Sequence, residues 1–286
     1  MSTPNNGPIV VGMDSSPRAM EAAEFAAAEA RTQRLPLLVV HCFMWPTFYP
    51  PLLEPDPGDP GPHVRARSLL DHATEELRGK YPDINITSRL RNGPPAAMLT
   101  DQSNRAAMLV VGHRGTGGFH ELHVGSVAIH TAAHAHCPVA VVRGWPAPPN
   151  GPVVVGLDGS VESERARAFA FAAAHRRGVP LRVVAVWPPH AGLPSHIEAA
   201  AREATPQIIV DDLGDLPADY PDVVVEARLL RDHSVAGALI TESLDAGLIV
   251  VGSKGIGGLR DILLGSVGRA LIAHARCPVV VVRGQR

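Results

Sequence analysis

The chain has 286 residues, of which 45% are hydrophobic and 19% charged, and its formal net charge is -2. This length suits one large domain or two of ordinary size. A charge so near neutral argues against a broad nucleic-acid surface, and an aromatic content of 4% argues against stacking platforms for single strands. Three cysteines favour a reducing compartment, and no apolar run reaches the roughly 20 residues that cross a bilayer. We therefore expect a cytoplasmic protein with no nucleic-acid or membrane partner.

The first half of the chain alternates short apolar runs with helical stretches. Predicted strands cover 8–12, 37–42, 84–91, 107–112 and 138–143, and predicted helices follow Ser16 and cover 64–79, 95–105 and 125–135. This alternation predicts a parallel, right-handed, doubly wound sheet. In such sheets ligands bind at the carboxyl ends of the strands. A proline-rich loop from Pro46 to Pro62 is expected to border that site.

The second half repeats the first. The segment 9–16 matches 153–160, 37–42 matches 181–186, and 134–143 matches 274–283. The offset between matching residues is 144 in the early segments and 140 in the late ones. The sequence therefore predicts two tandem domains, at 1–144 and 152–286, joined by a stiff proline-rich linker at 145–151.

Each half carries the pattern Gly-x2-Gly-x9-Gly-Ser after an apolar run. Glycine lets the backbone approach a ligand closely or adopt a positive φ. A Gly-Ser that begins a helix presents unpaired amides and the positive end of the helix to an anion. The pattern therefore predicts one phosphate-binding cradle in each half.

Together with a Gly-x-Asp after the first strand of each half, these motifs resemble the universal stress protein family, specifically its tandem-domain members, over nearly the whole chain. The resemblance implies two five-stranded parallel sheets flanked by helices, of the Rossmann-like, adenine nucleotide alpha hydrolase-like kind. It also implies ATP binding at each domain, with Mg²⁺ expected on the phosphates. The adenine and ribose contacts then fall on Asp14, Cys42, Val111, Gly112 and Gly115, and on Asp158, Val186, Val251, Gly252 and Gly255. The phosphate contacts fall on Gly125, Ser126 and Val127, and on Gly265, Ser266 and Val267.

The two predicted sites are not identical. Cys42 stands where the second half has Val186, and Gly93 where it has His233. His120 and His123 of the loop that precedes the first Gly-Ser are matched by Arg260 and Leu263. These differences predict unequal affinities for the two sites.

Simpler interpretations stand beside the nucleotide site. Asp14 and Asp158 could cap helices, each Gly-Ser could be an ordinary helix start, and Arg114 and Lys254 could be solvated cations. His130 and His134 are spaced like some zinc ligands, but the second half has Ala270 and His274, so no metal site is predicted. Cys137 and Cys277 precede apolar strands, which favours buried packing.

The sequence predicts a nucleotide-binding regulator rather than an efficient enzyme. A P-loop and a serine nucleophile elbow are both missing from the sequence, and we can name no general base or catalytic residue, so at most slow ATP hydrolysis is expected. The alternative is an interaction module of the same fold that acts through dimerisation and whose pockets are empty or hold another ligand. In that case the apolar strands 138–142 and 278–282 would pair, within one chain or in a homodimer.

Overall fold

The computed structural model describes residues 7–44, 61–116, 124–143, 146–148, 150–187, 209, 213–255 and 264–283. The chain forms two compact units, Met1–Cys137 and Pro138–Arg286. Within the described residues, none of the helices is long and apolar enough to cross a membrane.

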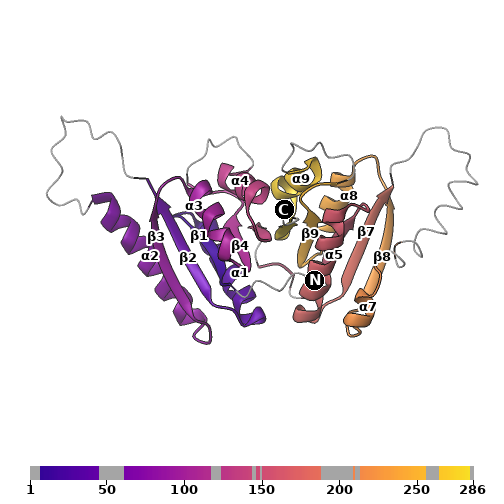
Figure 1. Cartoon of the computed structure of the whole chain (residues 1–286), viewed down its shortest axis with the longest axis horizontal. Helices are drawn as coiled ribbons and strands as arrows, with labels where there is room; N and C mark the ends of the chain where they lie inside the picture. Colours follow the sequence, from indigo (N-terminus) through magenta and orange to yellow (C-terminus); the bar gives the residue numbers. More distant parts are fainter. Residues whose placement is uncertain are drawn as a thin grey trace, which may run out of the picture. The chain divides into compact units, whose positions relative to one another are not determined.

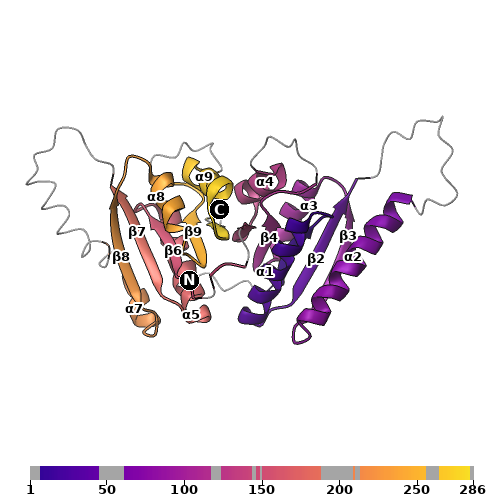
Figure 2. The same cartoon turned by 180° about the vertical axis from the view of Figure 1, so that it is seen from behind.

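The first unit is a parallel sheet with helices on both faces (Figure 1). Its strands lie in the order β3-β2-β1-β4, so the chain reverses direction across the sheet between β1 and β4. Helices α1 and α2 cover one face, and α3 and α4 cover the other (Figure 2). The elements are β1 (Ile9–Met13), α1 (Pro17–Gln33), β2 (Leu37–Phe43), α2 (Gly61–Lys80), β3 (Ile86–Asn92), α3 (Pro95–Gln102), the 3₁₀ helix η1 (Ser103–Arg105), β4 (Met108–Gly112) and α4 (Ser126–His134).

The second unit repeats this arrangement and adds one antiparallel strand. Its strand order is β5-β10-β9-β6-β7-β8, and β5 runs antiparallel to β10, with Val141 opposite Val279. Helix α5 packs on β6 and β9, while α8 packs on α9. The elements are β5 (Val139–Val142), β6 (Val153–Leu157), α5 (Val161–Arg177), β7 (Leu181–Trp187), α7 (Leu216–Asp219), β8 (Val225–Arg231), α8 (Val235–Glu242), β9 (Leu248–Gly252), α9 (Ser266–His274) and β10 (Val279–Val282).

The central strands are buried on both faces, which explains their continuous apolar runs. Ile9, Val10 and Val11 are at most 1% exposed, and β1 pairs with β2 on one side and β4 on the other. Gly12 interrupts the run where α3 packs closely: a Cβ added there would lie 2.7 Å from Leu99 Cδ1. Gly156 of β6 faces Leu239 of α8 in the same way. The helices and strands therefore interlock at matching points in both units.

The structure confirms the predicted α/β class, with parallel, doubly wound sheets and flanking helices. The predicted helix at 95–105 divides into α3 and η1, and the other described elements lie within a few residues of their predicted bounds. The strands 138–142 and 278–282 do pair within one chain, but β10 also pairs with β9 and so has neighbours along both edges. The predicted pairing of these strands is therefore found within one chain, and the predicted homodimer stays a prediction. The linker at 145–151 is described only in part, so the predicted domain boundary stays a prediction.

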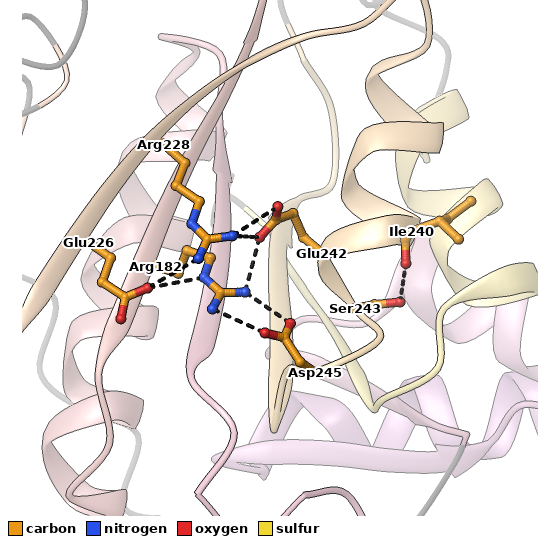
Figure 3. A network of polar contacts seen from close by, with 7 residues as sticks. All are labelled: Arg182, Glu226, Arg228, Ile240, Glu242, Ser243 and Asp245. Carbon is orange, nitrogen blue, oxygen red and sulfur yellow. Dashed lines mark hydrogen bonds and ion pairs between the residues drawn. The ribbon is translucent and has the colours of Figure 1, made fainter.

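A cluster of charged side chains surrounds the buried Arg182 at the amino end of β7 in the second unit (Figure 3). Arg182, only 5% exposed, donates to Glu226, Glu242 and Asp245 at 2.9–3.2 Å. Arg228 also donates to Glu242, which is 8% exposed. In the first half the residue that matches Arg182 is Leu38, and the residue that matches Glu242 is Gln102. The cluster is therefore a feature of the second unit alone, and it lies at the opposite end of the strands from the predicted nucleotide site.

Candidate nucleotide site

The predicted site residues other than Cys42 and Val186 gather around the topological switch point of each unit. In the first unit this is the carboxyl end of β1 and β4, and in the second unit the carboxyl end of β6 and β9. Ligands of open α/β sheets bind at such a point, because adjacent loops diverge there and leave a crevice. Asp14 follows β1 directly, and Gly115 follows β4 after two residues.

In the first unit the Asp14 carboxylate joins the two loops at the switch point. Its Oδ1 accepts from the Ser16 amide at 2.9 Å. Its Oδ2 accepts from the Thr116 amide at 2.9 Å and from the Thr116 hydroxyl at 3.4 Å. Asp14 and the loop that begins at Gly115 are thus brought together from positions about 100 residues apart, as the strand-end rule predicts. The helix cap itself is Ser16, whose Oγ accepts from the Ala19 amide, so Asp14 is not the N-cap.

The second unit places Asp158 in the matching position. Its Oδ1 accepts from the Ser160 amide at 3.0 Å and from the Ser160 hydroxyl at 2.7 Å. Ser160 is also the N-cap of α5, because its Oγ accepts from the Ser163 amide. In both units, therefore, the aspartate orders the turn before the helix while a serine caps it.

The glycines of Gly-x2-Gly are required by close contacts. A Cβ added to Gly115 would fall on Asp14 Oδ2, and one added to Gly255 would fall on Asp158 Oδ2. A Cβ on Gly112 would lie 3.2 Å from the backbone O of Arg18, and one on Gly252 would lie 2.9 Å from Glu162 Cβ. The first glycine of the pair thus packs against the first turn of α1 or α5, and the second lies against the aspartate.

The Gly-Ser segments begin helices that have no side-chain cap. Gly125 and Gly265 are the N-caps of α4 and α9, with φ/ψ of -73/144 and -67/164. Glycine has no side-chain oxygen, whereas α1, α5 and α8 are capped by serine side chains. The amides of Ser126 and Val127, and those of Ser266 and Val267, belong to the first turn, where a helix supplies no acceptor of its own. Both helix starts can therefore receive the oxygens of an anion.

The amides of the two capping glycines are already engaged. Gly125 N–H donates to His113 O at 2.8 Å, and Gly265 N–H donates to Ser253 O at 2.8 Å. Each bond joins the end of a loop to its beginning: the loop between β4 and α4 in the first unit, and the loop between β9 and α9 in the second. The predicted phosphate contacts are accordingly best made by the serine and valine amides, with the glycines fixing the approach of the backbone.

The predicted adenine contacts lie at the carboxyl ends of β2, β4, β7 and β9. Cys42 and Val186 are half-buried, while Val111 and Val251 are only 3% and 4% exposed. Burial raises the pKa of the Cys42 thiol to about 11, with a smaller opposing effect from Arg91. The thiol is therefore neutral at pH 7 and offers an apolar surface much like that of Val186.

Sequence reasoning missed two contacts beside the first site. Thr116 holds Asp14, and Arg18 Nη1 donates to His113 Nε2 at 3.1 Å, the only role open to a guanidinium. His113 is 3% exposed, as is Ser253 at the matching position. A comparison of the two halves could have drawn attention to Arg18, because its counterpart is Glu162.

Several predicted features lie outside the described residues. These include most of the loop 46–62 and residues His120, His123, Arg260 and Leu263. His130 and His134 are described, and their rings stack with centroids 4.2 Å apart. Among the described residues there is no group of three or more side chains of the metal-binding types.

Comparison with known proteins gives matches over both halves of the chain. A family model described as the universal stress protein family matches residues 5–143 and 149–283. A universal stress protein of Mycobacterium tuberculosis strain H37Rv is 35% identical over 285 residues, with 96% of each chain covered. A universal stress protein structure from Archaeoglobus fulgidus aligns with a TM-score of 0.69 at 16% identity, covering 98% of this chain and 97% of that chain. A shorter structure, of the universal stress protein from Archaeoglobus fulgidus in complex with dAMP, covers 46% of this chain and 97% of its own, at 28% identity and a TM-score of 0.35.

Proposed function

The chain belongs to the universal stress protein family, and we propose that it binds ATP, with Mg²⁺ on the phosphates, at one site in each half. The proposal rests on one arrangement that occurs in both units. The Gly-x2-Gly turn lies against an aspartate carboxylate, and a glycine caps the helix that follows this turn. This arrangement lies at the switch point of both units. A single copy could be an ordinary helix start, but two copies with the same internal contacts are better explained by a shared ligand.

The groups at each site suit the parts of an adenine nucleotide. The amides of Ser126 and Val127 can donate to phosphate oxygens, and the positive end of α4 favours their charge. The carboxylate of Asp14 can accept a hydrogen bond from a ribose hydroxyl, which requires that it share or release the Thr116 amide. The half-buried Cys42, at the end of β2, offers an apolar edge for the base. The second unit offers the matching set.

We propose a regulatory rather than a catalytic role. Phosphoryl transfer needs a positioned nucleophile and neutralisation of charge on the transferred group. The described residues of each site supply amides and an aspartate that is held by its own turn. The flanking cations are Arg18 and Arg114 in the first unit and Lys254 in the second. Bound ATP would then act by favouring one conformation of the loops around it, and hydrolysis would at most be slow. A cytoplasmic location and the lack of nucleic-acid and membrane partners belong to the same proposal.

The alternative is an interaction module that acts through a homodimer. Pairing of β5 with β10 favours it in one respect, because these strands do associate. However, β10 has neighbours along both edges, so a second chain would need another surface. Light scattering at high protein concentration tests this alternative: a mass near the 30.2 kDa of one chain contradicts a homodimer.

Isothermal titration with MgATP tests the proposed function. We expect two sites per chain. Gly115→Ala should remove one site and Gly255→Ala the other, because each new Cβ would displace an aspartate carboxylate into the space of the ligand. Gly79→Ala is the matched control, since a Cβ there meets nothing within 4 Å, and it should leave both sites intact. Absence of binding heat in the wild-type chain would contradict the proposal.

A further inference from the structure

One pair of matching helical residues gives the two predicted nucleotide sites opposite charges. Arg18 is the second residue of α1, and Glu162 is the second residue of α5, where the repeat matches them. The backbones of both residues lie against the first glycine of the Gly-x2-Gly turn. A Cβ on Gly112 would meet Arg18 O at 3.2 Å, and a Cβ on Gly252 would meet Glu162 O at 3.1 Å. The two side chains therefore occupy matching positions in the two units and carry opposite charges.

Arg18 is linked to the start of α4 by two hydrogen bonds. Its Nη1 donates to the buried His113 ring at 3.1 Å, and the backbone O of His113 accepts from the Gly125 amide at 2.8 Å. The guanidinium thus contacts His113, the residue whose backbone O binds the amide of the N-cap of α4. In the second unit Ser253 takes the place of His113, and its backbone O accepts from the Gly265 amide in the same way. The first turn of α5 carries Glu162 and Glu164, whereas the first turn of α1 contains no acidic residue.

Two further charged residues of the first site have counterparts of the same charge in the second. Asp14 corresponds to Asp158, and Arg114 corresponds to Lys254. Glu164 and Arg269 at the helix starts of the second unit have the uncharged counterparts Met20 and Ile129, and their charges offset each other. The exchange of Arg18 for Glu162 therefore leaves the first site with an excess of positive charge and the second with an excess of negative charge. Because metal-free ATP carries about four negative charges and adenosine none, this difference acts on the phosphates and leaves the base and ribose unaffected.

We propose that Arg18 and Glu162 set different ligand preferences for the two sites. The site of the first unit selects adenine nucleotides with a polyphosphate, and that of the second unit favours adenosine or a nucleotide with few phosphate charges. This inference rests on the proposed function and adds to it a ligand class for each site. It makes Arg18 and Glu162 determinants of specificity through charge, with no requirement that either side chain touch the ligand.

The test compares ATP with adenosine at each site of the full-length chain, by isothermal titration at low salt with excess EDTA. Gly255→Val leaves only the first site, and Gly115→Val leaves only the second. The quantity of interest is the ratio of the association constants for ATP and adenosine, because the contacts to the base and ribose cancel. We expect this ratio to be at least about tenfold larger at the first site, and the difference to shrink in 0.5 M salt because the charges are screened.

Charge-reversal variants then test whether Arg18 and Glu162 cause the difference between the two ratios. Arg18→Glu should lower the ratio at the first site about tenfold, and Glu162→Arg should raise it at the second site about tenfold. The neutral variants Arg18→Gln and Glu162→Gln should each give about half of that change on a logarithmic scale. The adenosine constants should stay within about twofold throughout, since adenosine carries no charge.

Matched reversals at the opposite end of the strands control for net charge. Arg105, in the 3₁₀ helix before β4, and Asp219, in α7 before β8, are both exposed. Arg105→Glu and Asp219→Arg should change the ratios by less than about twofold. The inference would be overturned if the ratio of the ATP and adenosine constants were equal at the two sites. It would also be overturned if the reversals at Arg18 and Glu162 changed this ratio no more than the control reversals do. Either result would leave the proposal of nucleotide binding intact. If neither ligand binds at either site, the proposed function itself fails, and the inference with it.

Discussion

Replacing Glu242 by Gln tests the account of the buried charge cluster in the second unit. Glu242 accepts from Arg182 at 3.0 Å and from Arg228 at 3.2 Å, and its side chain is 9% exposed. Gln keeps the shape but loses the charge, and its amide nitrogen cannot accept. Removing one partner of a fully buried ion pair costs about 3–5 kcal/mol. Arg182 keeps Glu226 and Asp245, so we expect a loss of about 2–4 kcal/mol, allowing for the charge-assisted hydrogen bonds that remain.

The assay is differential scanning calorimetry of the full chain. For a unit of this size each kcal/mol lowers the melting temperature by about 2–4 °C, so the transition of the second unit should fall by roughly 5–15 °C. Glu226→Gln is the control: that side chain is 40% exposed, and the change should cost less than about 1 kcal/mol. The double variant Arg182→Leu/Glu242→Gln recreates Leu38 and Gln102 of the first unit, and should be more stable than the two single changes predict. A Glu242→Gln variant as stable as Glu226→Gln would refute this reasoning.

Two further predictions concern titratable groups. The hydrogen bond from Arg182 lowers the pKa of the Asp245 carboxyl, so the stability that it contributes is present above about pH 4 and is lost as pH falls through the lower folded value. In urea unfolding at a series of pH values, Asp245→Asn should therefore reduce the loss of unfolding free energy at acid pH. The reduction should be small because the side chain is 64% exposed, and a loss equal to that of the wild type would contradict the assignment. Burial raises the pKa of Cys42 to about 11, so at pH 8 its thiolate should be about a hundredfold scarcer than for a thiol of pKa 9. Alkylation followed by mass spectrometry should find Cys42 slow in the native protein and fast in denaturant, and equal rates would be inconsistent with that burial.

The sequence was sufficient to predict the fold because local and long-range signals agree. Buried strands are continuous apolar runs, Ser16 and Ser160 cap the first helix of each half, and the two halves support each other's alignment. The rule for strand ends then brings Asp14 close to Gly115, although it could not identify Thr116 as the hydrogen-bond donor. Such a contact depends on the path of a loop and on one rotamer, neither of which leaves a periodic signal.

Other features escaped because they depend on pairings between distant elements. The saturation of both edges of β10 follows from the antiparallel pairing with β5, and strand composition alone does not reveal the order of strands. Arg182 had a detectable signal, a single charge within the buried run of β7, but its three acceptors come from β8 and from the region of α8. Arg18 was overlooked because an exposed helical arginine is ordinary until its counterpart is known to be Glu162.

Native mass spectrometry of the full-length chain with MgATP tests the central claim most directly. If both glycine-capped helix starts hold a triphosphate, the spectrum should show species with one and two bound ATP, and the doubly bound species should dominate at saturation. The Gly115→Ala and Gly255→Ala variants should each bind at most one ATP per chain. A chain that stays free of nucleotide at saturating ATP would contradict the claim that the repeated turns are phosphate cradles.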